Sequence, residues 1–503
     1  MTSIHYTRRS FLKNVGLGTA AYIISGCMSS QSFVVQKQKL PNIVYILADD
    51  LGYGDLSCNG QTHFQTPNID RLADEGMTFT QHYAGNTVCA PSRCSLMTGL
   101  HTGHAQVRGN KEIQPEGQAP MESGTVTIPT LLNKSGYVSG MFGKWGLGYP
   151  GSASDPMVFF DEFFGYNCQR YAHRYYPAYL WHNDKTVQLD GNNWTNKNTF
   201  APDIIQEKAL EFIERHNSQK TGKPFFLYYP STIPHAELIA PQDEILEGVL
   251  GKFDEKPYPG GNTDNLKRAP YGPNMDIPAY CSQEYPKAVF AALITRLDRQ
   301  VGEIIEKLKA LGIDDNTIVI FTSDNGAHAE GGIHPDDFNS NGQWRGMKRD
   351  LYEGGIRVPM IVRWPGKVKA GTTSDHISAF WDMLPTFCEI GGVAAPANID
   401  GISMLPVLLG QNSEQKKHEY LYWEFPAQGG KQAIRKDNWK GVRVNVQDNP
   451  DVEIELYNLE DDPREENNVA VKYPDIVREM KGLFKRARNE SETFPLFTTA
   501  GLN

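Results

Sequence analysis

Two pairs of oxygen-bearing side chains directly follow apolar runs of this chain. Asp49 and Asp50 come after "NIVYILA", and Asp324 and Asn325 come after "TIVIFTS". Because ligands gather where the strands of an open parallel sheet end, we expect both pairs at one edge of such a sheet. Hard oxygen donors without a His/Cys ligand set favour one Ca²⁺ ion, with Mg²⁺ the weaker alternative. Asx turns at strand ends are the ordinary explanation for either pair alone.

Neighbouring side chains of an extended strand point to opposite faces of the sheet. Both members of each acidic pair can therefore reach one ion only where the strand has ended. Gly52 and Gly326 follow the two pairs closely, and we expect them to allow that turn.

Cys89 opens the stretch "CAPSRCSLMTG". Pro91 suits the first turn of a helix that runs to Gly99, which places Cys89 just before a helix start that attracts anions. A thiolate at this place would be a credible nucleophile, but a soft ligand beside a hard ion. The other cysteines of the later chain have no metal-binding or dense disulfide spacing, and most are expected to be buried thiols: Cys58, Cys94, Cys168, Cys281 and Cys388.

With these motifs, nearly the whole chain after its first segment resembles the formylglycine-dependent sulfatases of the alkaline-phosphatase superfamily. The pentapeptide Cys89-Ala90-Pro91-Ser92-Arg93 matches the family's Cys-x-Pro-Ser-Arg signal for oxidation of the cysteine to formylglycine, and "GYVSGMFGKWGLG" matches its second signature. "ADDLGYGD", "IPHAE", "SDNGAH" and "RGMKRDLYEGGIRVP" match further family segments. The resemblance implies a formylglycine-generating maturase as a partner.

The resemblance also implies a role for each site residue. The Ca²⁺ ligands would be Asp49, Asp50, Asp324 and Asn325 with formylglycine at Cys89. Arg93 would support the hydrated aldehyde, while Lys144, His235 and Lys348 would contact the sulfate. Outside these motifs, a lone lysine is usually a solvated charge and a lone histidine often only completes a hydrogen bond.

The implied reaction is hydrolysis of a sulfate ester. One hydroxyl of the hydrated aldehyde, acidified by Ca²⁺, attacks sulfur, the alcohol leaves, and the second hydroxyl collapses to expel sulfate. The cation, Arg93, Lys144 and Lys348 would stabilise the charge that develops on the sulfuryl oxygens. We hypothesise that His235 protonates the leaving oxygen.

One position departs from the family pattern, which usually has histidine two residues after the signature lysine. This chain has Gly146 there, and His173 in "QRYAHRYYP" is a candidate substitute, although a packing histidine is the equal alternative. The aromatic segment "YAHRYYPAYLW", together with the predicted lipid anchor, indicates a sulfated carbohydrate, galactan or glycosaminoglycan, with a weak preference for a galactose-type sugar, while core packing is the ordinary explanation for these aromatics. Other candidate substrate contacts are Arg108, Asn110, Glu424 and Gln432.

Two other functions are compatible with the sequence. A phosphomonoesterase or phosphonate hydrolase of the same superfamily would share the metal site and would prefer phosphate esters in direct competition. A lipid-anchored glycan-binding protein would keep Cys89 unmodified and show no turnover. The net charge of −10 and the absence of a basic run exclude nucleic acid as the main partner.

These residues need an α/β fold to position them: an alkaline-phosphatase-like, mostly parallel central sheet flanked by helices, with a smaller C-terminal antiparallel-sheet subdomain. Apolar runs at 42–48, 223–230, 317–323 and 357–365 alternate with helical segments, of which 284–311 is the clearest. Three further strands at 419–425, 439–446 and 453–459 and a helix near 473–488 follow. We therefore predict a catalytic domain at 41–415 and an α+β subdomain at 416–503.

The N-terminal segment is read as an export signal rather than as part of the fold. Arg8 and Arg9 form a twin-arginine pair before an apolar run too short to span a bilayer. "ISGC" resembles a bacterial lipobox, which predicts a signal peptide at 1–26, lipidation of Cys27 and a linker at 27–40. We expect export by the twin-arginine translocase after maturation, and a lipid anchor at the periplasm or the outer-membrane or cell surface.

Overall fold

The computed structural model describes residues 39–193, 196–260 and 280–497. The predicted signal peptide at 1–26, lipidated Cys27 and most of the predicted linker lie outside the described residues and stay predictions. Within the described ranges, no helix is long and apolar enough to cross a membrane. The chain from Leu40 onward forms one compact unit, and the division predicted near residue 415 stays a prediction.

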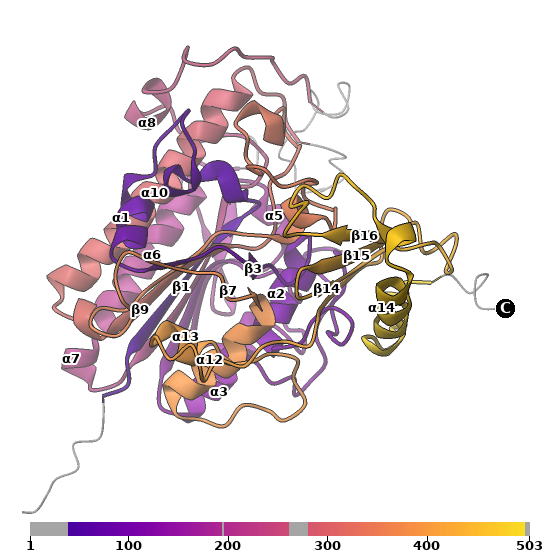
Figure 1. Ribbon diagram of the computed structural model, residues 1–503. Helices are drawn as coiled ribbons and strands as arrows, with labels where there is room; N and C mark the ends of the chain where they lie inside the picture. The colour runs from indigo at the N-terminus through magenta and orange to yellow at the C-terminus, as the bar shows by residue number, and fades with distance from the viewer. Residues whose placement is uncertain (1–38, 194–195, 261–279, 498–503) are drawn as a thin grey trace, which may run out of the picture. The chain divides into compact units, whose positions relative to one another are not determined.

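A ten-stranded sheet forms the centre of this unit, in the order β11-β2-β10-β9-β1-β8-β4-β5-β6-β7 (Figure 1). The strands are β1 (Asn42–Asp49), β2 (Met77–Phe79), β4 (Val138–Lys144), β5 (Glu162–Tyr166), β6 (Tyr179–His182), β7 (Lys185–Gln188), β8 (Phe225–Pro234), β9 (Thr317–Ser323), β10 (Met360–Arg363) and β11 (Thr372–Ser374). The central strands from β9 to β5 are parallel. The mostly parallel sheet expected from the sequence is confirmed.

Helices cover both faces of this sheet (Figure 1). On one side lie α1 (Pro67–Asp74), α6 (Ala201–Arg215) and α10 (Pro286–Ala310), and on the other α2 (Cys89–Thr98), α3 (Ile128–Lys134) and α12 (Met383–Gly391). The β1 sequence explains this, because Val44 and Ile46 enter one core while Tyr45 and Leu47 enter the other. A strand buried on both faces is apolar throughout.

The segment at 357–365 differs from its expected place among the parallel strands. Its strand, β10, pairs antiparallel with β9 on one side and with β2 on the other. An apolar run shows that a strand is buried, but its direction depends on the connection that precedes it. The connection between β9 and β10 contains Lys348, and this connection is the one that leads to the antiparallel strand.

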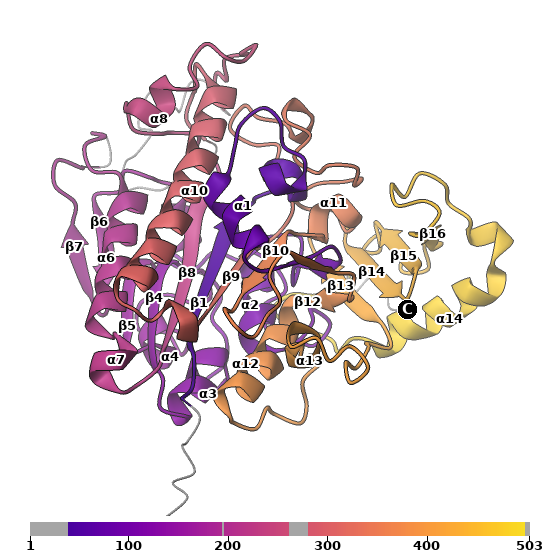
Figure 2. The same cartoon turned by 60° about the vertical axis from the view of Figure 1, so that its left-hand side comes forward.

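The C-terminal sheet has four antiparallel strands: β13 (Leu421–Phe425), β14 (Lys431–Lys436), β15 (Trp439–Val444) and β16 (Glu455–Asn458). Figure 2 shows this sheet with α14 (Pro474–Arg486) beside it. Sequence reasoning missed β14, whose "KQAIRK" has only two apolar residues. Ala433 packs in the core on one face of the sheet and Ile434 in the core that includes α14. Each face of β14 therefore has a single apolar residue in these cores, which is too few to show the alternating pattern of a strand in the sequence.

A buried charge cluster joins this sheet to the rest of the unit. Lys440 of β15 is fully buried and lies 2.8 Å from Glu353, the first residue of α11 (Glu353–Ile356), and 3.0 Å from Glu465. Burial alone would raise the pKa of Glu353, but Lys440 and Arg357 hold it near 2. Burial raises the pKa of Glu465, and the adjacent Glu353 raises it further. Lys440 therefore compensates two carboxylates at once.

We expect Lys440→Met to destabilise the protein by about 3 kcal/mol or more, because it leaves buried Glu465 without its cation and Glu353 with Arg357 in place of two cations. Lys436→Met is the matched control, since Lys436 of the neighbouring strand pairs with Glu479 at the surface and surface pairs contribute little. Urea or thermal unfolding checks both variants. Similar small losses in the two would mean that Arg357 alone neutralises this cluster.

Candidate active site

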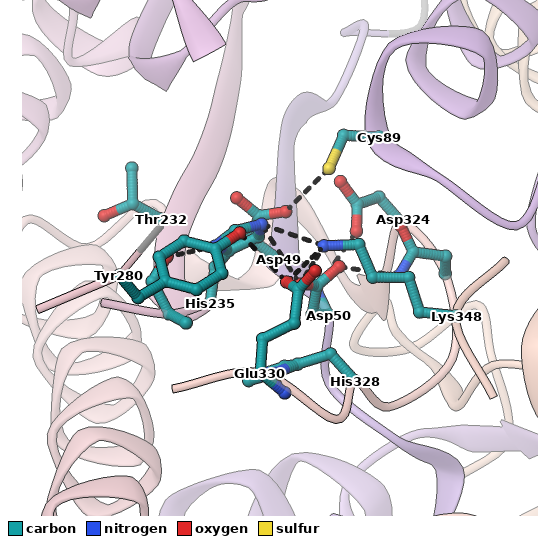
Figure 3. A network of polar contacts seen from close by, with 12 residues as sticks. Asp49, Asp50, Cys89, Thr232, His235, Tyr280, Asp324, His328, Glu330 and Lys348 are labelled. Carbon is teal, nitrogen blue, oxygen red and sulfur yellow. Dashed lines mark hydrogen bonds and ion pairs between the residues drawn. The ribbon is translucent and has the colours of Figure 1, made fainter. Parts of the chain in front are cut away.

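Four parallel strands deliver side chains to one edge of the sheet. Asp49 ends β1 and Asp50 follows it, Lys144 ends β4, His235 directly follows β8, and Asp324 directly follows β9. Because these strands are parallel neighbours, their carboxyl ends meet at one edge, as the sequence predicted. Figure 3 shows Asp49, Asp50, His235 and Asp324 gathered there with Cys89 and Lys348.

The turn after β1 differs from the expected one. The residue in the left-handed region is Asp50, with φ of 63°, and its N–H donates to Asp324 Oδ1 at 3.1 Å. Gly52 has an ordinary φ of −71°. A Cβ atom on Gly52 would lie 2.2 Å from the Ser340 carbonyl oxygen, and one on Gly326 would lie 1.8 Å from that of Gly354. Both glycines are needed for close backbone approach, not for the turn.

Each carboxylate of this edge is paired with a buried cation. The pairs are Asp49 with Lys144 (2.6 Å), Asp50 with Lys348 (2.7 Å) and Asp324 with Arg93 (2.8 Å). None of these six residues is more than 5% exposed. An isolated buried charge would cost several kcal/mol, so the three cations and three carboxylates stabilise one another as a group.

Cys89 is the first residue of α2 and only 2% exposed. Its Sγ lies 3.3 Å from Asp49 Oδ1 and 3.3 Å from Lys144 Nζ. Burial raises the pKa of the Cys89 thiol well above its ordinary value, and the charge of Asp49 raises it further against the opposing effect of Lys144. An unmodified cysteine is therefore held as a thiol, which is a poor nucleophile.

The carboxylate and amide oxygens at this edge suit a hard divalent cation, although the cluster also includes the Cys89 thiol and the His235 ring, the latter not expected as a ligand. Ligand atoms of Asp49, Asp50, Cys89 and His235 lie within 4.8 Å of one another. The amide N–H of Asn325 donates to Asp50 Oδ1 at 2.7 Å, and its buried Oδ1 has no partner among the residues that the structure describes. Burial, and then the adjacent Asp49, raise the pKa of Asp324 to about 7. A cation at this place would relieve the crowding of carboxylates, and oxygen donors suit Ca²⁺.

His235 lies beside Asp50 in this cluster, and His173 packs against His235. The rings of His173 and His235 stack with centroids 4.0 Å apart. His235 Nε2 lies 2.9 Å from Lys348 Nζ and 3.2 Å from Asp50 Oδ2. Burial, and then the charges of Lys348 and Lys144, lower the pKa of His235 well below its ordinary value. The ring is thus neutral and accepts a hydrogen bond from Lys348, so an acid role would require it to gain a proton.

Sequence reasoning missed Glu330 as a site residue. Its carboxylate accepts from Lys348 Nζ at 3.1 Å and from the Tyr280 hydroxyl at 3.0 Å, and it pairs with Arg349. Burial alone would raise the pKa of Glu330, but Lys348 holds it below its ordinary value. Lys348 is therefore shared between Asp50 and Glu330. The sequence offered one indication of this role, which is that Glu330 lies only six residues after the predicted metal ligand Asp324.

The other predicted substrate contacts fall in two places. Asn110 is exposed and accepts a hydrogen bond from the Ala90 N–H at 3.2 Å, which places it beside Cys89. Arg108 and Glu424 are buried and paired at 2.8 Å. Gln432 is buried as well, and its amide donates to Tyr422, accepts from Arg443 and is thereby satisfied. The Arg108–Glu424 pair joins the C-terminal sheet to the rest of the unit, whereas Gln432 bonds within that sheet, and substrate binding by these three residues stays a prediction.

The space beside Gly146 is filled by another part of the chain. Gly146 has a φ of 78°, and a Cβ atom there would lie 2.5 Å from Gln169 Cγ and 2.8 Å from Gln169 Nε2. Gln169 begins α5 (Gln169–Ala172), and His173 caps that helix. The segment that was expected to compensate for Gly146 thus reaches the site, but Gln169 rather than His173 lies over the glycine.

Comparison with known families accords with this geometry. The family model described as Sulfatase matches residues 41–393, and the model described as N-sulphoglucosamine sulphohydrolase, C-terminal, matches residues 342–490. This chain belongs to the sulfatase family. Its fold class, predicted from the sequence as alkaline-phosphatase-like, is confirmed with it.

Two sulfatases and one further solved structure are similar to this family member over most of its length. The N-acetylgalactosamine-6-O-sulfatase of Bacteroides thetaiotaomicron is 30% identical, covering 93% of this chain and 97% of that protein. The N-acetylgalactosamine-6-sulfatase of Mus musculus is 31% identical over 73% of this chain, which spans only 66% of the mouse protein. The crystal structure of Ps i-CgsB in complex with k-i-k-neocarrahexaose is 27% identical, with a TM-score of 0.71 over 92% of this chain and 96% of that one.

The fit of Gln169 over Gly146 can be tested with a glycine of the same conformation. Gly151 also has a φ of 78°, but no atom lies within 4 Å of a Cβ built there. We expect Gly151→Ala to cost about 1 kcal/mol for the left-handed backbone alone. Gly146→Ala should cost at least as much again and lower sulfate ester turnover, because it displaces Gln169. Urea unfolding and turnover measure the two effects, and equal results for both variants would contradict this fit.

Proposed function

We propose that this sulfatase-family protein hydrolyses sulfate esters of sulfated carbohydrates, with Cys89 as the precursor of formylglycine and Ca²⁺ as the cofactor. The observation that carries the proposal is the place of Cys89 Sγ, at 3.3 Å from both a metal-ligand carboxylate and a buried ammonium group. A nucleophile formed from this side chain would lie beside both the carboxylate of Asp49 and the ammonium group of Lys144, which are themselves paired at 2.6 Å. Family membership supports the same activity.

The chain's own groups divide into three tasks. Asp49, Asp50, Asp324 and Asn325 would hold the ion, which supplies positive charge beside the nucleophile when it is bound. Arg93 is fixed by Asp324 and donates to the Lys144 carbonyl oxygen, so its position is set before any substrate arrives. Lys144 and Lys348 offer ammonium groups to the sulfate oxygens, on which negative charge grows during transfer.

A galactose-type sugar is the substrate class that we favour. Two of the relatives described above are named for sulfate removal from N-acetylgalactosamine. A relative of lower identity, 28%, is named an N-acetylglucosamine-6-O-sulfatase, so the position of the sulfate and the sugar configuration both need direct testing. The three cations of the site are matched by three carboxylates, so the positive charge that would favour an anionic ester is that of the bound divalent cation.

The deciding experiment starts from protein coexpressed with a formylglycine-generating enzyme. Peptide mass spectrometry should find the aldehyde or its hydrate at residue 89, and the matured protein should hydrolyse 4-nitrophenyl sulfate and sulfated galactose-type disaccharides. Cys89→Ala should abolish turnover, and removal of Ca²⁺ by a chelator should reduce it reversibly. A persistent thiol at Cys89 despite a modified control substrate would overturn the proposal, and preference for a phosphate ester in direct competition would favour a phosphoesterase.

The acid role proposed for His235 can be tested by comparing a sugar sulfate with an activated aryl sulfate. If His235 protonates the leaving oxygen, His235→Gln should reduce turnover of a sugar sulfate by roughly 100-fold but affect 4-nitrophenyl sulfate much less, because nitrophenolate leaves without a proton. The ratio of the two kcat/KM values is the measurement. Equal losses on both substrates would assign His235 to holding Lys348 and Asp50 instead.

A further inference from the structure

Gln169 carries a buried amide that the protein does not satisfy. The residue is 4% exposed, and its Nε2 has no hydrogen-bond partner among the described residues. Its backbone N–H, by contrast, donates to Gln118 Oε1 at 2.9 Å. A buried donor left without an acceptor is costly, so such a group in a folded protein calls for a ligand or another explanation.

The position of this amide places it at the active-site edge. Gln169 follows the carboxyl end of β5, just as Gly146 follows that of the parallel neighbour β4. Gln169 Nε2 lies 2.8 Å from where a Cβ of Gly146 would be. Two residues before Gly146, Lys144 extends its Nζ to 3.3 Å from Cys89 Sγ. The unpaired donor therefore lies beside the backbone segment that carries Lys144, whose ammonium group reaches Cys89.

A second contact from the same segment reaches the site independently. His173 lies four residues after Gln169 and caps the short α5 helix, so the two side chains project from one side of this turn. His173 stacks on His235, which in turn contacts Lys348 and Asp50. The side of α5 that carries Gln169 is thus the side that borders the charge cluster.

We propose that Gln169 is a substrate-contacting residue whose Nε2 donates a hydrogen bond to a sulfate oxygen of the bound ester. This inference rests on the proposed sulfatase function. A neutral amide suits this place because it adds a donor without adding a fourth buried cation to a cluster whose three cations are already matched by three carboxylates. The residue would select for the anionic group and not for the sugar ring.

The test compares three variants of the matured full chain. Gln169→Leu removes the donor at similar volume, and Gln169→Glu replaces it with a carboxylate that repels sulfate. Gln206→Leu is the matched control, because Gln206 is a glutamine of equal burial whose amide donates to the Gln300 carbonyl oxygen between α6 and α10. Formylglycine content, thermal unfolding, KM and kcat for 4-nitrophenyl sulfate, and Ki for inorganic sulfate are measured for each.

We expect KM and the Ki for sulfate to rise roughly 10- to 100-fold in Gln169→Leu, and further in Gln169→Glu. Gln206→Leu should keep both constants at wild-type values even if it unfolds at a lower temperature. Wild-type KM and Ki in either folded Gln169 variant would overturn the inference, as would a fall in kcat alone, which packing explains. If the matured wild type turned over no sulfate ester, the proposed function would fail, and calorimetric titration with sulfate would still decide whether Gln169 binds it.

Discussion

The structure depends on the burial of like charges at one edge of a parallel sheet. Asp49, Asp50 and Asp324 lie close enough that Asp49 helps to raise the pKa of Asp324. In a site with almost no solvent exposure, such a group is stable only if positive charge is buried with it. The fold supplies that charge from three separate elements, which are helix α2, strand β4 and the loop that holds Lys348.

This constraint explains why the backbone packs so tightly around the site. Gly326 and Gly354 approach so closely that no Cβ atom could stand between them, and Gly52 meets the Ser340 carbonyl oxygen in the same way. These contacts bring the loop of Lys348 onto the ends of β1 and β9. Glycines at these positions are therefore needed for the charge pairs as well as for packing. A larger distance between the two backbone segments would separate the charges and leave carboxylates unpaired.

The same principle recurs at the C-terminal sheet on a smaller scale. Lys440 is buried between Glu353 and Glu465, so the sheet is held by charge as well as by its apolar face. Glu353 lies five residues after Lys348 in the chain. Its pairing with Lys440 therefore attaches the C-terminal sheet to the end of the loop that carries Lys348. The sheet thereby supports the loop that delivers a cation to the active site.

Much of the fold and site could be predicted because the signals are local. The apolar run of β1 and a helix close after Val88 needed only neighbouring residues, although Cys89 is the first residue of that helix and not the one before it, and motif resemblance named Lys144 and Lys348. Glu330 and Gln169 escaped because their meaning lies in contacts rather than in spacing. β14 escaped because its two apolar residues face different cores.

The sequence by itself determined where β1 and β9 end, the modification motif and the family of this protein, since each is written in a short continuous stretch. Only the tertiary structure decided which charge pairs with which, as Arg93 meets Asp324 across 231 positions of the chain. It also decided that Gln169 fills the space over Gly146. Such contacts arise from the crossing of separate elements, and the free energy of a buried charge or amide depends on its neighbours in space rather than in sequence.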